Sequence, residues 1–286
     1  MSLNRVTIIG LGLMGGSLAL ALKRAALATH IVGCGRRQVV VDQALEMGAV
    51  DSGSTSAAEA VAESDFIFLC TPVETSIQLM REIAPHLKPD ALLTDVGSTK
   101  QSFAAAARKI FGAQASARVL PGHPLAGREV SGLEHATDDL YSGSVWALTP
   151  LDASSHESHG LLRAALEAIG ARVVCVSPEE HDNVLAYTSH LPQMLSTALS
   201  MTLAQRFADE QNPALQIHAG GLRSMLRLAA SDPVMWEQIA SSNAANIAEA
   251  LECFEHELRT LRESLGKPDF RHRFEAAREF AKLVKS

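Results

Sequence analysis

A glycine-rich segment near the start of the chain constrains the fold more than any other feature. Gly10, Gly12 and Gly15 form the spacing GxGxxG between an apolar run at residues 6–9 and an alanine- and leucine-rich stretch at residues 17–27. In such a strand–turn–helix unit the first glycine makes the tight turn, the second lets backbone N–H groups approach a pyrophosphate, and the third lets the helix pack on the strand. A structural glycine turn is the alternative. The predicted cofactor-binding residues here are Gly10, Gly12, Leu13, Met14 and Gly15.

Strand-like and helical segments alternate over the first part of the chain. Strand-like runs occur at residues 6–9, 30–33, 66–70, 92–95, 119–120, 145–148 and 173–176. Helical patterns separate most of them, for example at residues 39–47, 73–87, 100–111 and 157–169. This alternation predicts an α/β fold, a Rossmann-type, mostly parallel sheet wound on both faces.

The pattern changes after Ser177 and Pro178. From there onward the segments 179–209, 212–230, 233–265 and 270–284 carry only helical periodicity, and Pro192 is expected to kink or break the first of them. We therefore predict a dinucleotide-binding domain over residues 1–177 and an all-helical domain over residues 178–286. Four helices in about 110 residues make a thin core, so we expect the helical domain to form a homodimer.

Composition restricts the class of protein. Apolar residues make up 47% of the 286 and charged residues 20%, as in soluble globular proteins. The net charge of −7 argues against a nucleic-acid partner. No apolar run reaches the about 18 residues of a membrane span, and residues 1–5 leave no room for a secretory signal. The four cysteines show no metal-binding spacing, so we expect a cytoplasmic protein without a structural metal.

The end of the second predicted strand bears on which dinucleotide binds. NAD-preferring folds place an acidic residue there to accept hydrogen bonds from the ribose 2′-hydroxyl. This chain has Gly35 followed by Arg36 and Arg37, two guanidinium groups suited to a 2′-phosphate. The alternative is that Arg36 stacks on the adenine while Arg37 is solvated. The sequence favours NADP over NAD.

Ligands in such sheets bind at the carboxyl ends of the strands. Thr71 and Pro72 follow one strand and are expected to line the nicotinamide side. Ser98 follows the next strand, where it can cap the following helix and can also reach cofactor or substrate.

Two histidines are candidates for the site. His123 lies between glycines in the segment GHPLAG, and a neutral imidazole with a pKa near ~6.5 can accept a proton while a hydroxyl carbon loses hydride. His190 precedes Pro192 in SHLP, where a kink could turn it toward a substrate. A solvated loop histidine and a polar residue at a kink are the respective alternatives.

Later residues offer partners for an anionic substrate. Arg223 and Arg227 are four apart and share one helical face, as substrate ligands or as plain surface cations. Trp236 would supply an apolar wall.

These motifs give the chain a family resemblance over nearly its whole length. It resembles prephenate dehydrogenase and its relatives, arogenate and cyclohexadienyl dehydrogenase. The matching segments are GLGLMGGS at 10–17, DVGSTK at 95–100, GHPLAG at 122–127, SHLP at 189–192 and SDPVMW at 231–236.

The resemblance implies an NAD(P)-dependent oxidative decarboxylation in tyrosine biosynthesis, by a dimer whose helical domains pack together. It implies that His123 accepts the proton of the ring hydroxyl, that Ser98 assists it, that His190 contacts the substrate and that Arg227 binds a substrate carboxylate. Hydride leaves the hydroxyl-bearing ring carbon, and the resulting ketone is an electron sink for loss of the ring carboxylate. The enzyme therefore needs positioning and electrostatics rather than a metal.

The chain departs from the family pattern near the predicted substrate. Arg128 precedes Glu129 where the family usually has Thr or Ser, and Arg223-Ser224 replaces the usual Arg-Asp pair. Leu226 stands before Arg227 where the family usually has Thr. These changes leave prephenate, arogenate or a secondary-metabolite analogue open as the cyclohexadienyl substrate. With no regulatory domain after Ser286, any tyrosine inhibition is expected to be competitive. The predicted substrate-binding residues are His190, Arg227, Arg128, Arg223 and Trp236.

Two other functions share parts of this pattern. A β-hydroxyacid dehydrogenase or imine reductase has the same fold plan, but the former group uses a lysine in the second domain, and this chain has none between Lys109 and Lys267. A non-catalytic NADP-binding regulator would give no reason for His123 and His190 to be where they are. The dehydrogenase is the favoured interpretation.

Overall fold

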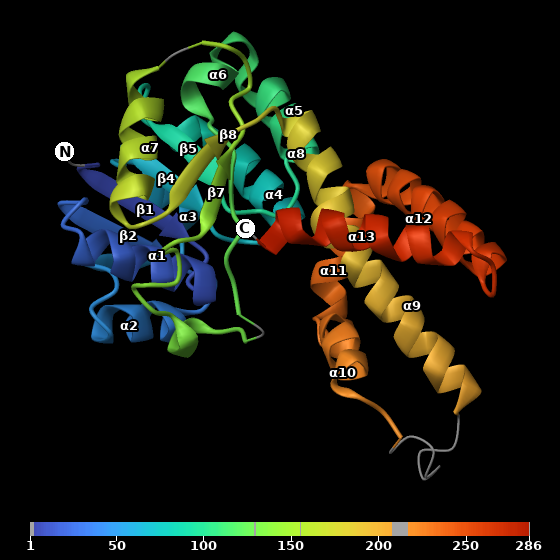
Figure 1. Ribbon diagram of the computed structural model, residues 1–286. Coiled ribbons are helices and arrows are strands. Elements are labelled where there is room, and N and C mark those ends of the chain that lie inside the picture. Colours follow the sequence, from blue (N-terminus) through green and yellow to red (C-terminus); the bar gives the residue numbers. More distant parts are fainter. Residues whose placement is uncertain (1–2, 129, 155, 208–216, 286) are drawn as a thin grey trace. The chain divides into compact units, whose positions relative to one another are not determined.

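The computed structural model describes residues 3–128, 130–154, 156–207 and 217–285 (Figure 1). The chain forms two compact units. The first combines Met1–Val184 with Ala230–Ser242, and the second combines Leu185–Ala229 with Asn243–Ser286. The chain thus returns once to the first unit before it ends in the second. The domain boundary predicted after residue 177 stays a prediction, and Glu129 and parts of the predicted segments 179–209 and 212–230 lie outside the described residues.

A five-stranded parallel sheet forms the centre of the first unit. Its strand order is β3-β2-β1-β4-β5, so the chain runs outward from β1 to one side and then from β4 to the other. The crevice for a ligand is expected where the order reverses, between β1 and β4. The strands are β1 (Arg5–Ile9), β2 (His30–Cys34), β3 (Ser52–Ser54), β4 (Phe66–Leu69) and β5 (Leu92–Asp95).

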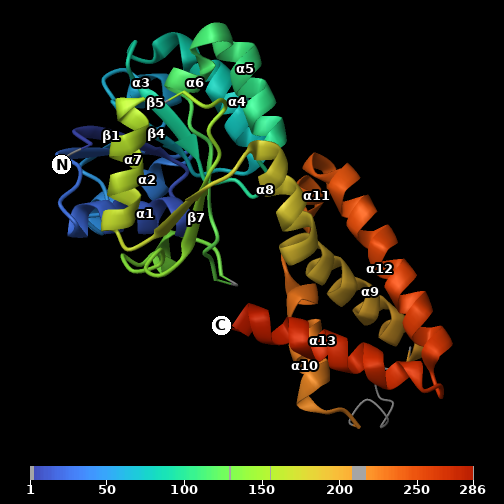
Figure 2. The same ribbon diagram turned by 45° about the horizontal axis from the view of Figure 1, so that its top comes forward.

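Helices pack on both faces of this sheet because its strands are apolar on both faces. Phe66 and Phe68 of β4 belong to one buried cluster, whereas Ile67 and Leu69 belong to another. The first cluster includes residues of α1, α2 and α7, and the second includes residues of α3, α4 and α5, which can be followed in Figure 2. These helices are α1 (Leu13–Arg24), α2 (Gln38–Glu46), α3 (Ala57–Val61), α4 (Val73–Ile83), α5 (Gln101–Phe111) and α7 (Glu157–Ala168). The predicted fold class is confirmed.

A second, three-stranded sheet extends the first unit. It contains β6 (Gly122–Pro124), β7 (Val145–Leu148) and β8 (Arg172–Cys175), with β6 antiparallel to β7 and β7 parallel to β8. The strand predicted at residues 119–120 is wrong, because Val119 makes only an isolated bridge to Leu93. The strand lies just beyond it and contains His123. Gly122 and Pro124 argue against a strand at this segment, because glycine and proline are rare inside strands. Pro124 is accommodated because β6 is an edge strand of its sheet.

Three further helices complete the regular structure of the first unit. They are α6 (Ala115–Arg118), α8 (Pro178–Leu185) and α11 (Pro233–Ser242). Short 3₁₀ turns occur at η1 (Ala84–His86), η2 (Gly112–Gln114) and η3 (Leu133–His135).

The second unit is helical throughout its described residues. It contains a π-helical turn η4 (Ala186–His190), α9 (Leu191–Arg206), α10 (Gly220–Leu226), the 3₁₀ turn η6 (Arg227–Ala230), α12 (Ala244–Ser264) and α13 (Asp269–Lys285). The predicted kink or break at Pro192 does not interrupt the chain's helical structure, because the π turn leads directly into α9. Pro192, which has no N–H to donate, lies in the first turn of α9.

The core of the second unit is small. Its buried apolar cluster consists of Ala186, Ile247 and Ala250, with a few half-buried neighbours. Large apolar side chains such as Met201, Phe274 and Phe280 are exposed. None of the described helices combines the length and the hydrophobicity that a membrane span requires.

Candidate active site

The glycine turn after β1 is shaped by close backbone contacts. Gly10 has φ +104°, and a Cβ placed on it would lie 2.5 Å from the carbonyl oxygen of Cys70. A Cβ on Gly15 would lie 2.1 Å from the carbonyl oxygen of Gly10. By contrast, a Cβ on Gly12 would meet no heavy atom within 4 Å. Gly10 and Gly15 are therefore required by packing, whereas Gly12 leaves open space beside the turn, as close approach of a pyrophosphate requires.

The first turn of α1 presents backbone donors at this open space. Gly12 is its N-cap and has no side chain to satisfy the N–H groups of Leu13 and Met14, and the turn contains no acidic residue. Free N–H groups and the positive end of the helix dipole favour an anion there. The geometry fits a dinucleotide, and the expected contacts of Leu13 and Met14 with its phosphates stay a prediction.

The segment after β6 supports this turn, a feature that sequence reasoning missed. The Tyr141 hydroxyl donates to the Met14 carbonyl oxygen at 2.6 Å, and the Thr137 N–H donates to Ser17 Oγ at 3.0 Å. A Cβ on Gly16 would lie 2.4 Å from Leu133 Cδ1. The segment after β6 thus stabilises the start of α1, and a Cβ on Gly16 would force the side chains of Leu133 and Ala136 to shift.

The other predicted cofactor residues lie on neighbouring strand ends. Thr71 lies against the glycine turn, because a Cβ on Gly10 would be 2.9 Å from Thr71 Cγ2. The Thr71 hydroxyl forms a hydrogen bond with Ser76 Oγ at 2.8 Å. Pro72 follows it as the N-cap of α4. Arg36 and Arg37 follow β2 and are exposed, and within the described part of the chain neither has an ion-pair partner.

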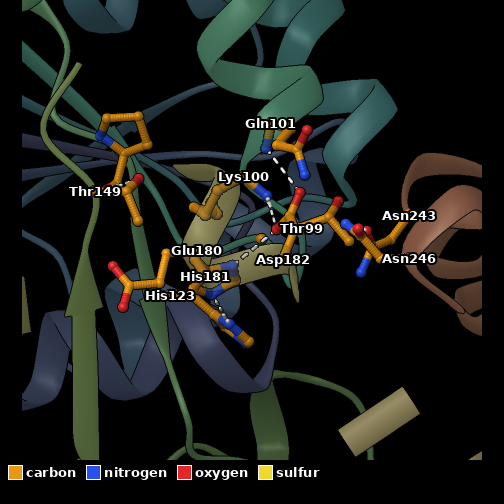
Figure 3. A network of polar contacts seen from close by, with 12 residues as sticks. Thr99, Lys100, Gln101, His123, Thr149, Glu180, His181, Asp182, Asn243 and Asn246 are labelled. Carbon is orange, nitrogen blue, oxygen red and sulfur yellow. Dashed lines mark hydrogen bonds and ion pairs between the residues drawn. The ribbon is translucent and has the colours of Figure 1, made fainter. Parts of the chain in front are cut away.

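His123 sits in β6 and is linked to two residues that were not predicted (Figure 3). Its Nδ1 lies 2.9 Å from Nε2 of His181, and Nδ1 of His181 lies 2.8 Å from Oδ1 of Asp182. All three side chains are buried, with exposed fractions of 8%, 2% and 0%. His181 and Asp182 belong to α8, 58 residues further along the chain. The signal in the sequence was a carboxylate next to a histidine in the segment PEEHD.

Asp182 also caps α5. Its Oδ1 accepts from the Lys100 N–H at 2.7 Å and its Oδ2 accepts from the Gln101 N–H at 2.9 Å. One expectation was that Ser98 caps this helix, and that expectation is wrong because the cap comes from Asp182. Ser98 is half-buried in the loop between β5 and α5, and its predicted role beside the substrate stays a prediction.

A fully buried ion pair fixes the backbone next to His123. The Lys100 ammonium donates to the Asp95 carboxylate and, at 2.8 Å, to the Gly122 carbonyl oxygen. The same carboxylate accepts from the N–H groups of Gly122 at 3.1 Å and Gly97 at 2.9 Å. Burial raises the pKa of the Asp95 carboxyl and lowers the pKa of the Lys100 ammonium, while the charge of each partner opposes the other's shift. Asp95 and Lys100 lie in the motif DVGSTK, but their side chains were not predicted to matter.

Two more predicted residues lie in the first unit. Trp236 is half-buried on α11, whose last residue, Ser242, bonds through its hydroxyl to Thr99 Oγ1 at 2.9 Å. This contact ties α11 to the loop that holds Ser98. Arg128 is exposed after β6, where it lies 3.7 Å from the carboxylate of Asp139 and donates to Thr137 at 3.3 Å.

The remaining predicted residues belong to the second unit. His190 is buried at the end of the π turn, and its Nδ1 lies 3.2 Å from the side-chain nitrogen of Asn243. π-Helical turns are rare and occur frequently at functional sites. Arg223 lies in α10, whereas Arg227 opens the following 3₁₀ turn, so the single α-helical face predicted for them is interrupted. Both arginines are exposed.

Known proteins resemble this chain over nearly all of its length. Residues 18–175 match the family described as "Prephenate dehydrogenase, nucleotide-binding domain", and residues 177–280 match "Prephenate dehydrogenase, dimerization domain". The prephenate dehydrogenase of Bacillus subtilis is 30% identical over 273 residues, which cover 95% of this chain and 72% of that protein.

Two solved structures are similar throughout. Prephenate dehydrogenase from A. aeolicus, in complex with hydroxyphenyl propionate and NAD+, has a TM-score of 0.84 at 33% identity, with 100% of this chain and 97% of that chain covered. Arogenate dehydrogenase from Synechocystis has a TM-score of 0.85 at 26% identity, with 98% and 99% covered.

A glycine turn on a doubly wound sheet defines a dinucleotide-binding protein. The matches make the class more specific: this chain belongs to the prephenate dehydrogenase family. It is an oxidoreductase that uses a nicotinamide cofactor. The predicted family and enzyme class are confirmed.

Proposed function

We propose that this chain oxidatively decarboxylates prephenate, arogenate or both, with His123 as the proton acceptor. The observation that carries the proposal is the buried imidazole of His123, held by His181 on one of its ring nitrogens and placed in β6 beside the strand-end loop of Ser98. The nicotinamide cofactor supplies the hydride acceptor when bound. A β-hydroxyacid dehydrogenase is not favoured because the chain has no lysine between Lys109 and Lys267. A non-catalytic regulator is not favoured because it gives His123 and His190 no role.

The residues of the chain have separate roles in this reaction. His123 takes the proton of the ring hydroxyl as the carbon gives up hydride, so that a ketone forms. The bond to the ring carboxylate then breaks and carbon dioxide leaves. The electron pair moves through the ring to the ketone oxygen, which takes the proton back from His123 and becomes the hydroxyl of a phenol. Ser98 assists at the hydroxyl, and His190 and Trp236 position the ring. The cations Arg227, Arg223 and Arg128 bind the substrate carboxylates.

A grid of four reactions tests this function. Prephenate or arogenate is combined with NAD or NADP, and reduced nicotinamide and carbon dioxide are both measured. We expect both products in equal amounts in at least one combination. Reduced nicotinamide without carbon dioxide would favour another dehydrogenase, and no turnover in any combination would refute the proposal.

We also propose a preference for NADP. Gly35 stands where an acidic residue would repel a 2′-phosphate, and the exposed guanidinium groups of Arg36 and Arg37 have no competing ion pair among the described residues. A charge-assisted hydrogen bond contributes about 1.5–3 kcal/mol. Arg36→Ala should therefore raise KM for NADP by about 10–100-fold, since 1.4 kcal/mol is tenfold, and should change KM for NAD much less.

The control for this change is Arg81→Ala, which removes an exposed arginine from the last turn of α4. It should leave both cofactor constants unchanged. Equal effects of Arg36→Ala on NADP and NAD would contradict the 2′-phosphate site.

We further propose a homodimer formed through the second unit. Its buried cluster is small, large apolar side chains such as Phe274 and Phe280 are exposed, and this region matches a dimerisation domain. Light scattering should give twice the mass of one chain, whereas a monomer at micromolar concentration would contradict the proposal.

A further inference from the structure

Three buried side chains, those of Asp182, His181 and His123, are joined by a continuous line of hydrogen bonds (Figure 3). Asp182 Oδ1 lies 2.8 Å from His181 Nδ1, and His181 Nε2 lies 2.9 Å from His123 Nδ1. The rings of the two histidines meet edge to face, with an interplanar angle of 65°. The geometry constrains which nitrogen of each ring carries a proton.

Asp182 determines which atoms donate and which accept along this line of hydrogen bonds. Its two oxygens accept from the backbone N–H groups of Lys100 and Gln101, which can only donate. Both Asp182 oxygens are therefore acceptors in these contacts, as in an aspartate carboxylate. An ionised carboxylate only accepts, so Nδ1 of His181 must carry a proton and donate it.

The proton positions of the rings follow in sequence. A neutral imidazole with a proton on Nδ1 has a lone pair on Nε2. Nε2 of His181 therefore accepts, and Nδ1 of His123 donates to it. The lone pair of His123 is then on Nε2, and this atom is the basic one.

We propose that His181 and Asp182 are positioning residues that hold His123 in the Nδ1–H tautomer, with Nε2 as the atom that takes the substrate proton. The proposal rests on the proposed function for His123 as proton acceptor. The same line stabilises His123 after it has been protonated, because the cation donates through Nδ1 toward the charge of Asp182.

Two substitutions of His181 distinguish the effect of its hydrogen bonds on His123 from the effect of the space that its side chain fills. His181→Leu removes the acceptor that faces His123 and leaves a side chain of moderate size. His181→Gln keeps both functions, since its amide nitrogen can donate to Asp182 while its amide oxygen accepts from His123. We expect kcat to fall by about 10–10³-fold in His181→Leu, a part of the contribution of general base catalysis, with KM for the cofactor unchanged. His181→Gln should recover most of the loss.

The control is His86→Leu, the same change at an exposed histidine in η1, with unchanged kcat expected. Should His181→Leu not fold, His181→Gln and the nitrogen spectrum of the wild-type chain still decide the proposal. A kcat of His181→Leu equal to wild type would overturn it, and so would a kcat of His181→Gln as low as that of His181→Leu.

Nitrogen NMR of the full chain with ¹⁵N-labelled histidine, in the presence of cofactor, reads the tautomer directly. We expect the His123 Nδ1 to be protonated in the wild type and in His181→Gln, and the His181→Leu spectrum to show a mixture. Protonation of Nε2 in the wild type would overturn the proposal. Because this measurement needs no substrate, it separates the two proposals: absent turnover with prephenate and arogenate would refute the function alone.

Discussion

The candidate site has two halves, the glycine turn after β1 and the region around His123, and they consist of different chemical groups. The turn after β1 is made of backbone: Gly10 and Gly15 contribute by having no side chain, and Gly12 contributes open space. The region around His123 is made of buried polar side chains from β5, β6 and α8, together with Lys100 at the N-cap of α5. A site made of backbone tolerates change wherever there is room, whereas a buried polar site depends on every partner being present.

The difference follows from what each half must do. A pyrophosphate needs several N–H donors in a fixed curve, which a helix start supplies without charged side chains. A proton acceptor needs one ring in one orientation and one tautomer, which only further side chains can impose. The ion pair of Asp95 and Lys100 adds to this by holding both the N–H and the carbonyl of Gly122, the neighbour of His123.

The largest effect is expected at His123. His123→Asn keeps a polar side chain in β6 but removes the basic nitrogen, so kcat should fall by about 10²–10⁴-fold. Cofactor affinity, measured by fluorescence titration, should change little because the glycine turn is untouched. Unchanged kcat would show that the polar half of the site does not carry the proton transfer, and the comparison between the two halves would fail.

The next effect concerns the stability of the same half. Lys100→Met leaves Asp95 as a buried charge without its partner, and the free energy of unfolding should fall by about 3–5 kcal/mol at neutral pH. Chemical denaturation measures this loss. Lys109→Met, an exposed change on α5, the helix that begins directly after Lys100, should stay within about 0.5 kcal/mol of the wild type.

The pH dependence of the Lys100→Met variant has a definite sign. Burial raises the pKa of Asp95 in the folded chain, and loss of the Lys100 charge raises it further. Because the folded chain binds this proton more tightly than the unfolded chain, protonated Asp95 does not destabilise the fold below the unfolded pKa of about 3.9. Stability is then lost as the pH rises from that value through the pKa of Asp95 in the folded chain. The deficit of the variant should therefore shrink as the pH is lowered toward about 4. A deficit that grows on acidification would contradict the buried, ionised pair.

The same contrast explains what the sequence could predict. The glycine turn, the parallel sheet and the helical second unit follow from local spacing and periodicity, so they could be derived from consecutive residues. His123 could be singled out because it lies between glycines in the motif GHPLAG. The adjacent histidine and carboxylate of PEEHD are visible in the sequence, but the link from His181 to His123 could not be predicted because it joins residues 58 positions apart. Strand β6 was missed since its glycine and proline argue against a strand, and the cap of α5 was misassigned because its acceptor comes from α8.

The smallest effects are expected in the backbone half, where Gly15→Ala and Gly12→Ala form a matched pair. Alanine at Gly15 places a Cβ 2.1 Å from a backbone oxygen, so overpacking should cost about 1–3 kcal/mol of unfolding free energy. Alanine at Gly12 meets nothing within 4 Å and has an ordinary extended backbone, so stability should stay within about 0.5 kcal/mol.

The same pair separates folding from binding. The Cβ at Gly12 occupies the space that the cofactor phosphates need, so KM for the cofactor should rise about tenfold, equivalent to 1.4 kcal/mol. Thermal denaturation and cofactor titration of both variants measure the two effects. If Gly12→Ala lost stability and kept its cofactor affinity, the open space would be part of the packing, and the two halves of the site would be alike.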